Sequence, residues 1–164
     1  MINKCTNPEL LPILHQLMKY KNYFNLLKSD AYTYPKIRDC IGTIPHQLKD
    51  WFNLFDGGLL FTTNMFSTRE SSKDFSQLLT FSEINSIDFK KENNIHPDIV
   101  CFAMTNYGNY YCYVKNEKNE YIYEWDSEKS SLIIKWDSFA EWLSDQIDFA
   151  NSLIQDDLLE PIGE

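Results

Sequence analysis

The chain has 164 residues, and its 24 acidic side chains outnumber the 15 basic ones, which leaves a net charge of −9 at neutral pH. This charge disfavours a protein that binds nucleic acid directly through a positive surface. Hydrophobic residues make up 43% and aromatic residues 15% of the chain, so a folded core is expected and disorder along the whole length is excluded. The length favours a single domain over residues 1–164.

The N-terminal sequence MINKCTNPELLPILHQL lacks the apolar core and the small-residue cleavage site of a secretory signal. No run of the chain carries the apolar length that a bilayer span requires. We therefore expect a cytoplasmic protein that does not associate with a membrane.

The cysteines show neither a CxxC spacing nor a histidine partner at zinc-finger distance, and we expect them to be small buried hydrophobic residues. If the neighbouring strands form a hairpin with Met104 opposite Asn109, Cys101 lies directly opposite Cys112, where a disulfide is geometrically possible. A reducing compartment opposes that bond.

The beginning of the chain predicts a long helix. Asn7, followed by proline and glutamate, is a suitable N-cap, and apolar residues recur at helical spacing to about Leu27. Residues 29–36 are interpreted as a loop.

A second helix is expected to begin at Pro45 and to end at the glycine pair 57–58, because glycine accepts a left-handed cap without a steric penalty. Residues 59–63 then predict a strand. Residues 64–76 predict a polar loop, and residues 78–81 a short strand before a brief helical turn.

The second half of the chain is dominated by short strands with turn-like connections, predicted at residues 100–104, 109–114, 120–125 and 132–136. Such short connections require antiparallel neighbours, which gives a meander. A final helix starts after Ser138, which forms a capping box with Glu141. The order of elements predicts an α+β fold, in which a mainly antiparallel sheet is covered by N-terminal helices and a C-terminal helix.

The negative charge is concentrated near the C-terminus. Residues 1–116 carry 12 basic and 11 acidic side chains, whereas residues 117–164 carry 3 basic and 13 acidic ones, a net charge of −10. One interpretation is a solvated outer face, and the other is a negative patch that steers a basic partner protein. The candidate partner-binding residues are Glu117, Glu120, Glu124, Asp126 and Glu128, with Asp145 and Asp148 on the final helix.

The sequence contains no pattern typical of a catalytic, cofactor or metal site, and its three histidines lie in separate segments. Glu124 and Asp126 fall on one face of a predicted strand, opposite Trp125, so a carboxylate-based hydrolase stays an alternative. An exposed face suits this acidic pair better. Tyrosines crowd both faces of the predicted meander, which is a composition found in protein interfaces.

Four segments, taken in order, resemble the SUKH superfamily, whose relatives include the yeast cell-wall assembly regulator. They are IPHQLKDWFNLFDGG at residues 44–58, FAMTNYGNYY at 102–111, IYEWDSE at 122–128 and SFAEWL at 138–143. The resemblance covers residues 36–147. Two positions depart from the common pattern: Asp56 stands where the family often has asparagine, and Asn106 where an acidic residue is often seen.

This resemblance implies an α+β domain without catalytic activity. Bacterial members resemble immunity proteins that bind and neutralise a polymorphic toxin, often a nuclease, and eukaryotic members resemble regulatory interaction modules. The expected function is therefore that of a binding protein with a basic toxin as its partner. The alternatives are a scaffold or regulatory module without a toxin and, third, the carboxylate-based hydrolase.

Overall fold

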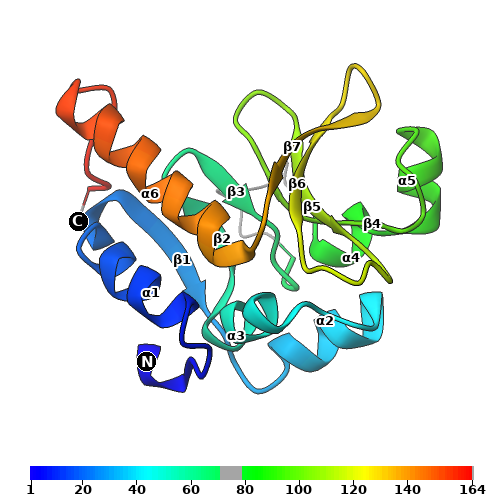
Figure 1. The fold of residues 1–164 in the computed structure, drawn as a ribbon, viewed down its shortest axis with the longest axis horizontal. Helices are drawn as coiled ribbons and strands as arrows, with labels where there is room; N and C mark the ends of the chain where they lie inside the picture. The colour runs from blue at the N-terminus through cyan, green and yellow to red at the C-terminus, as the bar shows by residue number, and fades with distance from the viewer. Residues whose placement is uncertain (71–78, 164) are drawn as a thin grey trace.

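A seven-stranded antiparallel sheet organises the residues that the computed structural model describes, which are 1–70 and 79–163. The strands follow one another across the sheet in chain order (Figure 1). Their bounds are Phe24–Lys28 (β1), Phe55–Leu60 (β2), Thr63–Met65 (β3), Ile99–Met104 (β4), Tyr110–Val114 (β5), Ile122–Asp126 (β6) and Ser131–Trp136 (β7). The predicted α+β class is confirmed.

Six α-helices accompany the sheet in the described residues, and the N-terminal helices and the last helix pack on it as predicted. They are Leu10–Met18 (α1), Thr33–Ile41 (α2), His46–Leu54 (α3), Phe81–Ile84 (α4), Ile87–Glu92 (α5) and Phe139–Gln155 (α6). Short 3₁₀ turns lie at Ile2–Lys4 (η1) and Lys21–Tyr23 (η2). Helix α6 lies beside α1, while α5 lies at the opposite side of the view (Figure 1).

The first helix is shorter than predicted. It ends at Met18, and the residues expected to continue it form β1, in which Phe24 pairs with Leu60 and Leu26 with Gly58. The apolar residues of this segment fit both a helical and an alternating period, so pairing with a distant strand decides the outcome. The predicted loop at 29–36 is also partly wrong, because α2 begins at Thr33.

The second helix begins after Pro45 as predicted, but it ends at Leu54, and the glycine pair lies inside β2. Both glycines have positive φ, 77° for Gly57 and 111° for Gly58. A Cβ on Gly58 would overlap the carbonyl oxygen of Asn25 on the paired strand. Glycine is therefore required by close contact between backbones and not as a helix stop.

The structure revises the segments that follow. The predicted strand at 59–63 is divided, because Phe61 has a φ of 56° in a turn between β2 and β3. In the predicted loop 64–76, Met65 and Phe66 are buried, and residues 71–76 lie outside the described residues. The strand predicted at 78–81 is wrong where it is described, since Phe81 begins α4. Helix α5 was not predicted.

The meander of the second half is confirmed, including the pairing of Cys101 with Cys112. A register irregularity between Cys101 and Ala103 places Met104 opposite Tyr110 rather than Asn109. All four cysteines are free thiols, and Cys40 is the one that is exposed. Burial raises the pKa of Cys101 to about 12, which keeps this thiol protonated and unreactive near neutral pH.

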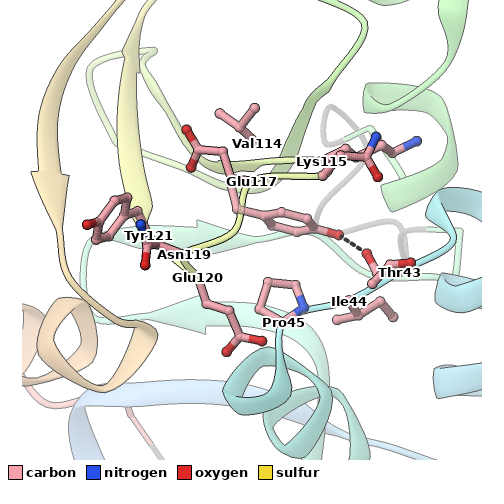
Figure 2. Close-up of a pocket in the computed structure, with 11 residues that line it drawn as sticks. Thr43, Ile44, Pro45, Val114, Lys115, Glu117, Asn119, Glu120 and Tyr121 are labelled. Atoms are coloured by element: carbon pink, nitrogen blue, oxygen red, sulfur yellow. Dashed lines mark hydrogen bonds between the residues drawn. The ribbon is translucent and has the colours of Figure 1, made fainter.

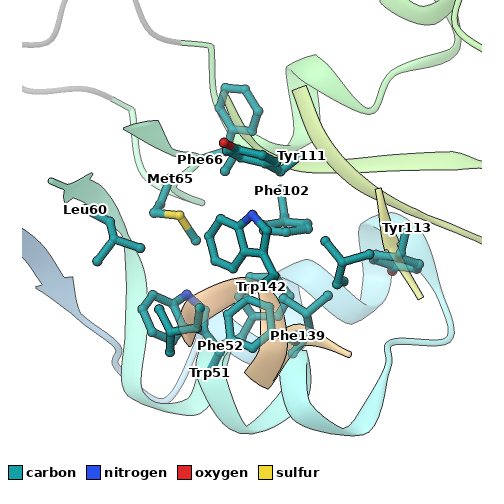
Figure 3. Close-up of a cluster of buried hydrophobic side chains, with 14 of the residues drawn as sticks. Trp51, Phe52, Leu60, Met65, Phe66, Phe102, Tyr111, Tyr113, Phe139 and Trp142 are labelled. Carbon is teal, nitrogen blue, oxygen red and sulfur yellow. The ribbon is translucent and has the colours of Figure 1, made fainter. Parts of the chain in front are cut away.

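Aromatic side chains fill the core between α3, α6 and the sheet (Figure 3). The ring of Trp142 on α6 meets Phe102 of β4 edge to face, with centroids 5.2 Å apart, and lies 5.1 Å from the ring of Tyr111. The predicted capping box starts α6, since Ser138 Oγ accepts from the Glu141 N–H at 3.1 Å. The Glu141 side chain accepts in turn from the N–H of Asp137, one residue before the cap. This start fixes the helix that carries Asp145 and Asp148.

Candidate partner-binding site

The seven predicted contact residues do not form one cluster. Strand β6 pairs with β7 from Ile122 opposite Trp136 to Asp126 opposite Ser131. Glu117 and Glu120 precede the first end of this hairpin, and Asp126 and Glu128 lie at its other end. Asp145 and Asp148 lie on α6.

A small pocket of about 70 Å³ lies where the β5–β6 connection meets the start of α3 (Figure 2). Glu120 accepts hydrogen bonds there from the backbone N–H of His46 at 3.1 Å, and it lies 2.8 Å from that histidine's Nδ1. Glu117 accepts from the hydroxyl of Tyr123 at 3.0 Å. Burial, followed by this contact, raises the pKa of Tyr123 to about 12. The pocket has room for a few water molecules, and both carboxylates already bind neighbouring groups.

Glu124 and Asp126 hold different turns. Glu124 is only 3% exposed, and its Oε1 accepts from the hydroxyl of Tyr107 at 2.7 Å and from Nδ2 of Asn109 at 3.0 Å. Asp126 Oδ1 accepts from the backbone N–H groups of the following turn, both at 2.9 Å. The expectation that Glu124 lies on an exposed face is wrong. A register irregularity between Glu124 and Trp125 interrupts the alternation, so both side chains are buried.

The three remaining candidates are exposed, but only two of them are unengaged. Asp145 accepts from the indole N–H of Trp136 at 2.7 Å. The carboxylates of Glu128 and Asp148 make no hydrogen bond or ion pair with any residue that the structure describes. They are therefore the predicted residues best suited to contact a partner without first breaking an internal bond.

An open groove of about 600 Å³ lies between α6, the β4–β5 turn and the segment that follows α6. Three exposed apolar side chains line it: Tyr107 at 66%, Phe149 at 55% and Leu158 at 71% exposure. Gln146 of α6 accepts from the hydroxyl of Thr63 at 3.1 Å and so joins the helix to β3. This volume falls in the range of ligand-binding clefts.

This groove was not predicted, although the sequence carries one signal for it. Phe149 lies outside the apolar stripe of α6, which runs through Phe139, Trp142, Leu143, Ile147 and Ala150. A large apolar residue on the solvent side of an amphipathic helix marks a candidate contact position. Tyr107 belongs to the tyrosine-rich meander that predicted an interface.

A second buried carboxylate belongs to β2 and does not line the groove. Asp56, at 1% exposure, accepts from the Thr68 N–H and the Thr68 hydroxyl, both at 2.7 Å, and from the hydroxyls of Thr33 and Ser67. Its Oδ2 also lies 3.1 Å from Nε of Arg69. These contacts join β2 to α2 and to the segment after β3.

Within the residues described, no group of three or more histidine, cysteine or acidic side chains is arranged to hold a metal ion. Among the same residues, no helix is long and apolar enough to cross a bilayer.

Comparison with known proteins agrees with the resemblance found in the sequence. The model of the SMI1 / KNR4 family (SUKH-1) matches residues 36–145, about two thirds of the chain. No curated protein matches significantly. The matched region includes α3, the glycine pair of β2, strands β4–β7 and the start of α6. The chain therefore belongs to the SMI1 / KNR4 family, SUKH-1.

Proposed function

We propose that this protein is an immunity-type binding protein, which neutralises a basic toxin by direct contact and carries out no catalysis itself. Membership of the SUKH-1 family supports this proposal, because bacterial proteins of the SUKH superfamily resemble immunity proteins. The observation that carries it is the negative charge of residues 117–164, which contain 13 acidic side chains and 3 basic ones.

The charge distribution suits a basic partner. A nuclease toxin needs a positive surface to hold its nucleic-acid substrate, and an acidic inhibitor can occupy that surface competitively. Long-range attraction between the two surfaces also speeds association at low salt. Glu128 and Asp148 are exposed and unengaged within the described part of the chain, so they can contribute to both effects.

The positions of Glu124 and Asp126 favour binding over hydrolysis. A two-carboxylate hydrolase needs both acids to flank a substrate. Here Glu124 is buried beneath Tyr107, and Asp126 caps the turn that follows β6. Each carboxylate is used to hold local structure.

The first experiment is capture of partners from a lysate of the source organism at low salt, with mass spectrometry of the bound proteins. We expect a basic protein that is released as the salt concentration rises. Co-expression then tests function, since growth arrested by the captured protein alone should be restored by this chain. A captured partner with no toxicity would overturn the immunity proposal and favour a regulatory module.

A matched pair of charge reversals tests whether the acidic region acts locally. Glu128→Lys with Asp148→Lys changes the net charge by the same amount as Glu83→Lys with Glu92→Lys, whose sites lie on α4 and α5. We expect the first pair to slow association with the captured partner by about tenfold at low salt and to reduce its salt dependence. Equal effects of the two pairs would show that net charge, and not this region, controls binding.

A further inference from the structure

The groove beside α6 combines exposed apolar side chains with a negatively charged one, Asp145. Tyr107, Phe149 and Leu158 reach it from the β4–β5 turn, from the helix and from the segment after the helix. Single exposed apolar side chains are common, but three that line one groove form a candidate contact surface.

Tyr107 is held in place before any partner arrives. Its hydroxyl donates to the buried Glu124, and the same carboxylate oxygen accepts from Asn109. Ser127 fixes this turn further, because its N–H donates to Asn109 Oδ1 at 3.2 Å and its hydroxyl donates to the Gly108 carbonyl at 2.6 Å. An aromatic ring that is already ordered loses little conformational entropy on binding.

The charges around the groove are negative. Asp145 is the one charged residue that lines it, and no basic side chain among the described residues does so. Glu124 lies beneath Tyr107, with no basic side chain within ion-pair distance in the described part of the chain, and Asp148 lies next to Phe149 on α6. Asp157 directly precedes Leu158. A partner segment with lysine or arginine beside an apolar side chain is complementary to this arrangement.

We propose that this groove binds a cationic peptide segment of a partner protein, with an aromatic or aliphatic side chain of that segment seated against Tyr107 and Phe149. Basic side chains of the segment then lie close to Asp145 and Asp148. This inference deepens the proposed function, because it places the contact with the partner in one groove, and it rests on that function for the identity of the partner.

A second exposed apolar surface, on the edge strand β7, is less suitable. Leu132, Ile133 and Ile134 are each between 39% and 46% exposed. The register between β6 and β7 shifts at Glu124, which leaves Ile133 outside the paired positions, and Lys135 follows directly. An irregular strand with a lysine is a usual device against pairing with another strand.

Peptide probes test the groove without the toxin. A short lysine-rich peptide with two tryptophans is compared with one in which alanine replaces both tryptophans and with one in which glutamate replaces every lysine. Binding to the isotope-labelled full chain is followed by backbone amide NMR. We expect the cationic aromatic peptide to shift the resonances of residues 105–109 and 145–158, and both control peptides to bind at least about tenfold more weakly.

Variants of the chain complete the test. Phe149→Ala and Tyr107→Ala should each weaken binding of the cationic aromatic peptide about tenfold or more, because they remove the apolar contacts. Tyr32→Ala, at a tyrosine that is 70% exposed on another surface, should leave the affinity unchanged. Phe149 is the safer position, since no hydrogen bond of the fold depends on its side chain.

Three outcomes would contradict the proposal that this groove binds a cationic segment. They are no binding of the cationic aromatic peptide, equal binding of the alanine peptide, or resonance shifts centred on Glu117 and Glu120. These outcomes are separate from failure of the immunity proposal. If the chain neutralises a toxin and Phe149→Ala does not weaken binding of that toxin, the proposed contact in the groove is wrong and the proposed immunity function is supported. If the peptide binds as expected and no captured partner is toxic, the groove is supported as a binding site for cationic segments and the proposed immunity function is wrong.

Discussion

Two buried carboxylates, Asp56 on β2 and Glu124 on β6, differ in how the surrounding residues compensate their charge. Asp56 accepts from several hydroxyl and N–H groups and lies beside the guanidinium of Arg69. Of the residues that the structure describes, Glu124 accepts only from two neutral donors of one turn, Tyr107 and Asn109. The charge of Asp56 is compensated within the fold. The charge of Glu124 lacks a cation among the described residues, so its field extends toward the groove.

The largest difference in the free energy of unfolding between the two regions should appear when their glycines are replaced by alanine. Gly58 and Gly108 both have positive φ, 111° and 92°. A Cβ on Gly58 meets the Asn25 backbone, whereas a Cβ on Gly108 meets nothing within 4 Å. Gly58→Ala should cost roughly 3–5 kcal/mol from strain and overlap, and Gly108→Ala about 1–2 kcal/mol from strain alone. Urea unfolding measures both. Equal losses would contradict the close approach of β1 and β2.

Amide substitutions compare the two carboxylates directly. Asp56→Asn should lose roughly 2 kcal/mol, because it replaces an acceptor of several donors and weakens the contact with Arg69. The ion pair itself contributes little to this loss, since the Arg69 side chain is 41% exposed and its charge is screened by water. Glu124→Gln keeps an oxygen for Tyr107 and Asn109 and removes a buried charge without a cation, so its stability should stay within about 1 kcal/mol of the natural chain.

The decisive result is the difference between these two variants in one series of urea unfolding curves. Asp39→Asn, at an exposed carboxylate, is the control for the chemical change itself. If Glu124→Gln is as costly as Asp56→Asn, Glu124 is a structural anchor of the same kind. Glu124→Gln should also weaken binding of the cationic peptide, because it removes negative charge beneath the groove.

The order of strands β4–β7 was predictable because alternating residues and short turns are local signals that leave antiparallel pairing as the consistent arrangement. The opposition of Cys101 and Cys112 followed from the same reasoning. The first half was harder. Residues 24–28 suit either a helix or a strand. The residues of β2 with which they pair lie more than 25 positions later in the chain.

The candidate site was predictable in part. The excess of acidic residues after position 116 and the tyrosine-rich meander are visible in the sequence. The burial of Glu124 was not predictable, because it depends on a register irregularity in the β6–β7 pair that no residue type in the sequence indicates. Phe149 could have been noticed as an apolar residue outside the stripe of its helix, but its proximity to Tyr107 depends on how α6 packs over the sheet.

The smallest expected effect concerns the bond between Tyr107 and Glu124. Tyr107→Phe removes one hydrogen bond at the rim of the groove and should cost about 1 kcal/mol at neutral pH. Partial burial of its hydroxyl against the protein, followed by the contact with Glu124, raises the pKa of Tyr107 in the folded protein above its ordinary value of 10.0. The folded state therefore holds this proton more tightly than the unfolded state does. The resulting stability is fully present below about pH 10 and is lost as pH rises toward the folded pKa.

The stability difference between the natural chain and Tyr107→Phe should therefore shrink as pH rises above about 10, a change that urea unfolding at a series of pH values measures. Tyr32→Phe, at an exposed tyrosine, should show a difference near zero throughout. A Tyr107→Phe difference that stays constant with pH would mean that the hydroxyl is not held by Glu124. In that case the ring would not be ordered in advance, and the entropic reason for its role in the groove would be lost.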